Sequence, residues 1–356
     1  MEDNKDHKYN TTVICLSYNR PLFLKRVIEY HRQFYTGYKL LILDGSEKKI
    51  NVEDTNQIKY LHYPTKSYFD RWSKLKDLIN TDYCIFVSDD ELHVRSSVDK
   101  YVEFLEKNPE YSSCGGLPIL FTIFFRKYFR GMRIYEKLKS NDNDNPLDRI
   151  KFWMEDRLPN SLYSVLRTEV LKKIIVNISS LDRKLFPNLS TLIEDRVELA
   201  FAFAGKNKII NEFSWFRSQE NRIIGWFEDN EVLEEWWNIE ANKKKYFIEE
   251  AADFFCNINP QIDKDEFKNI FTNLYDKQTN FHFEAKERRL KKRKLMSNFK
   301  LIPKFIKKSI RLTFNLNGYT ISKYLKKYSV QNYIGDILLT EKFILKFYKK
   351  IDKSSL

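Results

Sequence analysis

Residues 83–92 read YCIFVSDDEL, an apolar run that ends in three consecutive carboxylates. Tyr83–Val87 has the composition of a buried strand, so Asp89, Asp90 and Glu91 follow where that strand is predicted to end. Short acidic runs are common at solvated junctions between a strand and a loop. This run is either such a junction or part of a binding site, and the segments around it favour the second reading.

Strand and helix patterns alternate along the chain before this stretch. The predicted strands are Thr11–Leu16, Lys39–Leu43, Ile58–His62 and Tyr83–Val87, and the predicted helices are Pro21–Tyr35 and Tyr68–Asn80. Alternation of this kind predicts an α/β fold with a mainly parallel sheet that is covered by helices on both faces.

Beyond Asp99 the pattern is less regular. Helices are predicted at 97–107, 168–175 and 190–205, a strand-like segment at 161–167 and a loop at 140–146. The clearest helix is Ser190–Gly205, because its apolar residues fall on one face and Gly205 stands at the position of a C-cap.

Polar residues follow three of the predicted parallel strands at the point where each strand ends. They are Ser17–Asn19, Asp44 and the acidic run 89–91. The carboxyl ends of parallel strands form the edge at which open α/β sheets bind ligands. The sequence contains neither GxGxxG nor a P-loop pattern, which disfavours dinucleotide and ATP sites of those kinds. Paired aspartates at this edge suit Mg²⁺ or Mn²⁺ that also binds a diphosphate.

Four segments resemble motifs of the family 2 glycosyltransferases of GT-A fold, in the family's order over residues 11 to about 226. They are TTVICLSYNRP (11–21), ILDGS (42–46), VSDD (87–90), which is similar to the DXD metal motif, and IEDRVELAFAFAGK (193–206), which is similar to the ED motif. The resemblance implies a GT-A fold, Rossmann-like with a mainly parallel sheet flanked by helices. It also implies transfer of a sugar from a nucleotide diphosphate to an acceptor hydroxyl.

The resemblance also implies roles on the donor side of the site. Tyr18 would lie against the nucleotide base, Asp44 would accept a hydrogen bond from it, Asp89 would hold the ribose or metal-bound waters, and Asp90 would bind the metal. The full set of implied nucleotide-sugar contacts is Ser17, Tyr18, Asn19, Arg20, Asp44, Arg71, Lys74 and Asp89, with Asp89 and Asp90 as the metal residues. Lys74 is equally well read as a solvated helix residue.

The catalytic residues are expected in the ED motif. An inverting displacement needs a carboxylate that takes the acceptor proton, and Asp195 is the candidate. Its neighbour Glu194 belongs to the same pair, but Thr191-x-x-Glu194 reads as a capping box, which would give Glu194 a structural role. A carboxylate in the first turn of a helix is kept ionised by the positive helix end. The segment QENR, 219–222, resembles part of the QxxRW element of processive family members, but Ile223 follows the arginine.

The positive charge of the chain is concentrated in its C-terminal part. Residues 284–356 carry 20 Lys and Arg against 5 Asp and Glu, a surplus of 15, so the other residues together carry −2 of the net +13. Basic residues interleaved with Leu, Ile and Phe predict amphipathic helices that bind an anionic membrane surface. A charged helix packed on the protein body is the alternative. The tail matches no nucleic-acid recognition module, so no nucleic-acid partner is expected.

We therefore predict a GT-A glycosyltransferase domain at 1–226, a helical region at 227–283 and a basic amphipathic helical tail at 284–356. The expected enzyme is inverting, depends on Mn²⁺ or Mg²⁺, and adds a sugar to a glycan or lipid-linked acceptor of surface polysaccharide such as capsule or lipopolysaccharide. Met1–Asn10 contains no apolar signal region and no apolar run spans a bilayer, so we expect a cytoplasmic protein, peripheral on the inner membrane face. Two alternatives stay open: a sugar nucleotidyltransferase, although the first loop lacks its glycine-rich pattern, and a non-catalytic basic adaptor for membrane or RNA.

Overall fold

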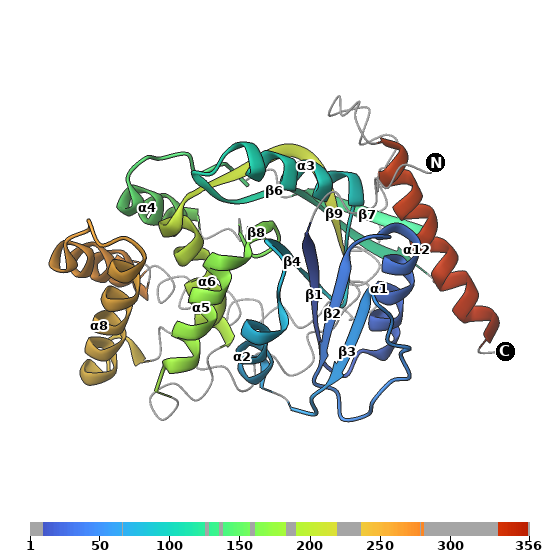
Figure 1. The fold of residues 1–356 in the computed structure, drawn as a ribbon, viewed down its shortest axis with the longest axis horizontal. Helices are drawn as coiled ribbons and strands as arrows, with labels where there is room; N and C mark the ends of the chain where they lie inside the picture. Colours follow the sequence, from blue (N-terminus) through green and yellow to red (C-terminus); the bar gives the residue numbers. More distant parts are fainter. Residues whose placement is uncertain are drawn as a thin grey trace, which may run out of the picture. The chain divides into compact units, whose positions relative to one another are not determined.

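The computed structural model places nine strands in one sheet (Figure 1). It describes residues 10–65, 67–124, 128–134, 138–156, 161–182, 190–218, 236–277, 279–280 and 334–354. The strand order is β3-β2-β1-β4-β8-β6-β9-β5, with β7 paired to β6. The strands are β1 Thr11–Ser17, β2 Lys39–Asp44, β3 Ile58–His62, β4 Tyr83–Ser88, β5 Glu91–His93, β6 Tyr111–Phe124, β7 Tyr128–Ile134, β8 Val165–Arg167 and β9 Lys206–Ser218.

The half of the sheet formed by β3, β2, β1 and β4 is entirely parallel. Ser17 lies opposite Asp44 of β2, and Leu16 lies opposite Ser88 of β4, so the carboxyl ends of three strands meet at one edge. These strands are buried along almost their whole length, as expected for a sheet covered on both faces.

The other half of the sheet mixes directions. β8 pairs antiparallel with β4 and β6, β6 pairs parallel with β9, and β5 pairs antiparallel with β9. The predicted fold class, an α/β Rossmann-like sheet flanked by helices with a helical C-terminal part, is confirmed. The sequence did not predict β5, β6 or β7, because β5 begins with an acidic residue and the aromatic run of β6 has no strand alternation.

Helices cover the two faces of the sheet. Odd-numbered strand residues such as Val13, Ile85 and Val87 belong to a core shared with α1 (Pro21–Phe34), α3 (Arg95–Lys107) and α12 (Ile334–Ser354). On the opposite face Trp72 of α2 (Tyr68–Leu78) stacks on Phe86, with ring centroids 4.7 Å apart. The other helices near that face are α5 (Thr168–Ser180) and α6 (Ser190–Ala204), and α4 (Pro146–Asp156) packs on α6.

Helix α12 packs against α1, although the two are far apart in the sequence (Figure 1). Arg26, which is fully buried, donates a hydrogen bond to the hydroxyl of Tyr348 at 3.2 Å. The hydroxyls of Tyr30 and Thr340 are 2.9 Å apart, and the ring of Phe343 meets that of Tyr30 edge to face. The described part of the predicted tail is therefore integrated into the core of the sheet domain.

The chain divides into two compact units. The first consists of Met1–Asp182, Leu189–Glu228 and Tyr319–Leu356, and the second of Arg183–Asn188 and Asp229–Gly318. In the second unit, α8 (Ala241–Ile258) and a helix that includes residues 264–277 enclose an aromatic core. The predicted domain limits at 226 and 283 stay a prediction. In the described segments, no helix combines the length and the apolar character that a membrane span requires.

Helix α6 ends where the sequence predicts, but for a different reason. Gly205 does not adopt the left-handed conformation of a C-cap glycine. It lies so close to the neighbouring chain that a Cβ atom would be 2.8 Å from the carbonyl oxygen of Glu110 and 2.9 Å from the backbone nitrogen of Ser112. A glycine is required here because two segments of backbone touch.

Candidate functional site

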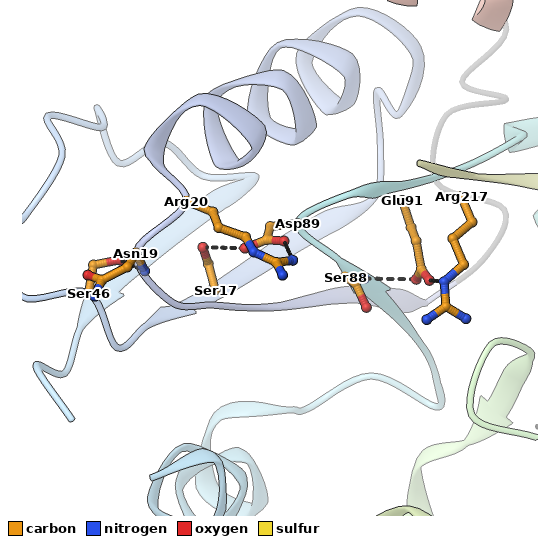
Figure 2. Close-up of polar contacts among 8 residues, drawn as sticks. All are labelled: Ser17, Asn19, Arg20, Ser46, Ser88, Asp89, Glu91 and Arg217. Carbon is orange, nitrogen blue, oxygen red and sulfur yellow. Dashed lines mark hydrogen bonds and ion pairs between the residues drawn. The ribbon is translucent and has the colours of Figure 1, made fainter. Parts of the chain in front are cut away.

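The loops after β1 and β2 are joined at the carboxyl edge of the sheet (Figure 2). The backbone N–H of Gly45 donates to the carbonyl of Ser17 at 2.8 Å, and the N–H of Asn19 donates to Oγ of Ser46 at 2.8 Å. The side-chain oxygen of Asn19 in turn accepts from the N–H of Glu47 at 3.1 Å. Asn19 has φ 52°, a left-handed conformation that Asn tolerates better than most residues. The segments Ser17–Asn19 and Asp44–Ser46 are therefore joined into one surface.

Asp44 is fully buried beneath this surface. One carboxylate oxygen accepts from the N–H of Ser46 at 3.0 Å and the other from the hydroxyl of Tyr60 at 2.7 Å. Burial and this hydrogen bond raise the pKa of Tyr60. Asp44 thus shapes the loop that follows β2, and its predicted contact with a nucleotide base stays a prediction.

Arg71 connects α2 to the same surface. Its Nη1 donates to the carbonyl of Thr65 at 2.8 Å, and its guanidinium lies 5.9 Å from the ring centroid of Tyr18. A Cβ atom on Gly45 would overlap the guanidinium of Arg71 and would lie 2.5 Å from the carbonyl oxygen of Thr65. Tyr18, Gly45 and Arg71 therefore come together as the resemblance implies, whereas Lys74 is exposed on α2.

Asp89 is held by the loop after β1. It accepts from Oγ of Ser17 and from Nη1 of Arg20, both at 3.0 Å, and is 3% exposed (Figure 2). Burial raises the pKa of Asp89 to about 6, and the charge of Arg20 opposes that rise. Both oxygens of Asp89 thus already have protein donors, so its position is that of a structural carboxylate.

The next two acids have different surroundings. The backbone carbonyl of Asp90, which is 8% exposed, accepts from the N–H of Ser218 at 3.1 Å. Glu91 is fully buried at the start of β5, where Oε2 accepts from the N–H of Ser88 at 3.1 Å and Oε1 lies 3.4 Å from Nε of Arg217 (Figure 2). Burial raises the pKa of Glu91 to about 8, opposed by the charge of Arg217. The acidic run is therefore not a solvated junction.

The donor set for a divalent cation is small. Within the described ranges, no group of three or more His, Cys, Asp or Glu side chains is arranged to hold a metal ion. Asp89 is bound by Ser17 and Arg20, which leaves the carboxylate of Asp90 as the better-placed ligand. Mg²⁺ and Mn²⁺ often bind through one or two protein carboxylates, with water and phosphate oxygens at the other positions. The residues present fit a cation held in that way.

The ED motif lies on α6, which already includes Ser190. No acidic residue lies in the first turn of this helix, so the prediction that Asp195 is a first-turn carboxylate was wrong. The helix begins at Ser190, as predicted, but Asp195 lies in its second turn, where the positive helix end stabilises a carboxylate less because its influence fades beyond the first turn. Thr191 follows Ser190 inside the helix and is therefore not the N-cap, so the predicted capping box of Thr191 and Glu194 was wrong.

Glu194 and Glu198 occupy neighbouring turns of α6. Burial raises the pKa of both carboxyls to about 7, and the charge of Arg217 acts in the opposite direction on Glu194. Glu198 accepts from the N–H groups of Ser161 and Leu162 at 2.8 and 2.7 Å. Asp195, next to Glu194, is half-buried. Arg217 pairs with Glu91, and its charge also lowers the pKa of Glu194, so this arginine interacts electrostatically with both acidic segments.

Arg217 is a site residue that sequence reasoning missed. It lies in β9, two residues after Trp215, and its guanidinium is 5.5 Å from the ring centroid of Tyr163. Nothing in the local sequence distinguishes this arginine from the other cations of the chain, because its partner Glu91 is 126 positions away. The QENR segment at 219–222 lies outside the described residues.

No protein-family model matches the chain, and no curated protein matches it. Among solved structures, S. aureus TarS 1-349 is similar at 13% identity and a TM-score of 0.44, over 75% of this chain and 71% of that one. The same fragment in complex with UDP-GlcNAc matches at 12% identity and 0.47, over 76% and 73%. A longer TarS chain matches at 12% and 0.44, over 75% of this chain and 43% of that one. The functional assignment therefore rests on the motifs and on the geometry of the site.

Proposed function

We propose that this protein is a glycosyltransferase of GT-A type that moves a sugar from a nucleotide diphosphate to a hydroxyl of a glycan or lipid-linked acceptor. The observation that carries the proposal is Arg217, which pairs with Glu91 of the DXD-like segment and acts on Glu194 of the ED-like helix. A donor bound at the sheet edge would thus have a carboxylate helix beside it, as glycosyl transfer requires.

The nucleotide would bind over the loops after β1 and β2. Tyr18 offers an aromatic face and Arg71 a cation beside it, which suits a planar base. Asn19 and Ser46 hold these loops together, so the surface is formed before the ligand binds. This arrangement supports the nucleotide roles that the resemblance implies, while the identity of the base is left to experiment.

Proton transfer is assigned to Asp195. In an inverting displacement the acceptor oxygen bonds to the anomeric carbon, the bond from that carbon to the diphosphate breaks, and the acceptor proton passes to a carboxylate. Glu194, whose pKa burial raises to about 7, is the other carboxylate of the ED pair.

A divalent cation, Mg²⁺ or Mn²⁺, would be held by Asp90. Such a cation neutralises charge that develops on a departing diphosphate. Asp89 would not bind the cation directly, since Ser17 and Arg20 already donate hydrogen bonds to its carboxylate.

We further propose a role in the assembly of surface polysaccharide such as capsule or lipopolysaccharide, at the inner face of the cytoplasmic membrane. Supporting this location, the exposed side of α12 carries several lysines, namely Lys342, Lys346, Lys349 and Lys350. Lysines gathered on one helix face favour contact with anionic lipid. The acceptor would then be a lipid-linked glycan.

A screen of nucleotide sugars for thermal stabilisation, with and without Mg²⁺ or Mn²⁺, tests the proposal. A ligand that binds only the folded state raises the melting temperature. We expect one nucleotide sugar to stabilise the protein in the presence of metal and to release its nucleoside diphosphate when an acceptor is added. If no nucleotide sugar binds under any metal condition, the protein is not a glycosyltransferase of this type.

A further inference from the structure

Arg217 interacts with both acidic parts of the candidate site. Its Nε is 3.4 Å from Oε1 of Glu91 (Figure 2), and its charge acts on Glu194 of α6. The next residue, Ser218, donates its backbone N–H to the carbonyl oxygen of Asp90 at 3.1 Å. The end of β9 thus brings Arg217 close to Asp90, the residue that would hold the metal.

The side chain of Arg217 is held by a stack of aromatic rings. The rings of His93 and Trp215 are 5.7 Å apart at 22°, and those of Trp215 and Tyr163 are 4.6 Å apart at 21°. The guanidinium of Arg217 continues this series at 5.5 Å from the Tyr163 ring centroid. Glu198 binds the loop that carries Tyr163. An arginine fixed on an aromatic face loses little freedom when it binds a ligand.

Arg217 is also accessible to a ligand. Its side chain is 39% exposed while its partner Glu91 is fully buried, so the guanidinium extends from a buried carboxylate toward solvent. Arg20, which pairs with Asp89, is 20% exposed. Carboxylates dominate this edge, so a bound diphosphate would be repelled unless cations faced it.

We propose that Arg217 binds the diphosphate of the donor and stabilises the negative charge that develops there as the sugar leaves. This inference rests on the proposed glycosyl transfer. As the acceptor oxygen bonds to the anomeric carbon, the electron pair of the breaking carbon–oxygen bond stays on the diphosphate, and the acceptor proton goes to Asp195. Arg217 keeps its own protons and donates hydrogen bonds to the departing oxygens.

A structural role for Arg217 as partner of Glu91 must be separated from this binding role. Arg217→Met leaves a buried carboxylate without its cation and is expected to destabilise the fold. The double variant Glu91→Gln with Arg217→Met removes both charges and should recover that stability. Arg167, whose guanidinium lies 5.9 Å from the ring centroid of Tyr83 at the start of β4, offers a matched control as Arg167→Lys beside Arg217→Lys.

The experiment is calorimetric titration of the full chain, in Mg²⁺, with UDP, GDP, CDP and TDP, and with the parent nucleoside of whichever diphosphate binds. We expect Arg217→Met and the double variant to lose affinity for the diphosphate by on the order of tenfold or more, with nucleoside affinity unchanged. The diphosphate affinity of Arg217→Lys should lie between the affinities of these two variants and that of the wild type. Arg167→Lys should bind the diphosphate as tightly as the wild type does.

Two results would overturn the inference alone: unchanged diphosphate affinity in Arg217→Met, or full recovery of that affinity in the double variant. Equal losses for diphosphate and nucleoside would also overturn it, because they would indicate a structural effect. A wild-type protein that binds none of the four diphosphates would overturn the proposed function and this inference together.

Discussion

At the scale of single residues, three adjacent carboxylates have three different surroundings. Asp89 is held by Ser17 and Arg20, the backbone carbonyl of Asp90 accepts from Ser218, and Glu91 is buried against Arg217. The sequence indicated a site at this place because the acids follow a buried strand. It could not assign the three roles, because each depends on a partner from another strand or loop.

Asp195→Asn should abolish sugar transfer while nucleotide binding stays close to that of the wild type, because the amide cannot take the acceptor proton. Initial rates and calorimetric titration of the nucleoside diphosphate would measure the two effects. Glu194→Gln is the matched control and should retain most of the activity. Near-normal turnover of Asp195→Asn would remove Asp195 as the base.

Asp89 and Asp90 should respond differently to replacement by Asn. Asp89→Asn weakens charge-assisted hydrogen bonds to Ser17 and Arg20, so we expect a loss of about 1.5–3 kcal/mol in unfolding free energy. Asp90→Asn should cost less unfolding free energy than Asp89→Asn and should weaken metal-dependent nucleotide binding. Urea unfolding and Mg²⁺ titration separate the two. The reverse pattern would mean that Asp89, not Asp90, is the metal ligand.

Gly45→Ala should displace Arg71, because the added methyl group overlaps its guanidinium and the nearby Thr65 carbonyl. We expect weaker nucleotide binding and a lower melting temperature. Gly335→Ala is the control, since no atom from another segment of the described residues lies within 4 Å of an added Cβ there. Wild-type nucleotide affinity in Gly45→Ala would show that Arg71 takes no part in binding.

At the scale of secondary-structure elements, the sequence predicted the parallel half of the sheet and its helices almost to the residue. Periodicity sufficed there because these strands are short, mostly apolar runs, and β1 and β3 are each followed by an amphipathic helix. It did not suffice for β5, which begins at Glu91, or for β6 and β9, whose pairing joins segments about 100 residues apart. The start of α6 was predicted at Ser190, as observed, but Asp195 was assigned to the first turn of that helix although it lies in the second.

Helix α1 buries a histidine that should make stability depend on pH. His31 is 3% exposed, its ring nitrogens have no hydrogen-bond partner among the described residues, and burial lowers its pKa from 6.5 to about 3. Above pH 6.5 the ring is neutral in both states. Below that pH His31 binds a proton in the unfolded chain but not in the folded protein. The free energy of unfolding therefore falls as the pH decreases toward 3, by about 2 kcal/mol at pH 5.

The variant His31→Phe tests this dependence, because a phenyl ring can keep the stacking on Tyr35 without titrating. Urea unfolding at pH 7.5 and pH 5.0 should show the variant gaining about 2 kcal/mol over the wild type on going to the lower pH. His93, whose pKa burial lowers to about 4, should leave part of the acid sensitivity in both proteins. An equal loss of stability in the two proteins would contradict the prediction.

At the scale of the whole molecule, α12 belongs to the core that covers one face of the sheet. Phe343 is 7% exposed and packs against Tyr30 and Phe34, whereas Leu339 is 47% exposed on the same helix. Phe343→Ala should therefore cost about 3–5 kcal/mol of unfolding free energy, and Leu339→Ala less than about 0.5 kcal/mol. Equal, small effects in urea unfolding would mean that α12 is not docked in solution. Charge and amphipathicity predicted a helix in this part of the chain, and the packing of α12 on the sheet domain corresponds to the alternative that the sequence left open, a charged helix packed on the protein body.

The docking of α12 on α1 limits how early the sheet domain can complete its core during synthesis. Arg26 and Tyr348 are 322 positions apart, so α1 leaves the ribosome long before its covering helix has been made. At about 5–20 residues per second, the ribosome needs roughly 15–60 s to add the intervening chain. During that interval the aromatic side of α1 is not yet packed against α12, and the nascent protein would be a substrate for chaperones that bind exposed hydrophobic surface.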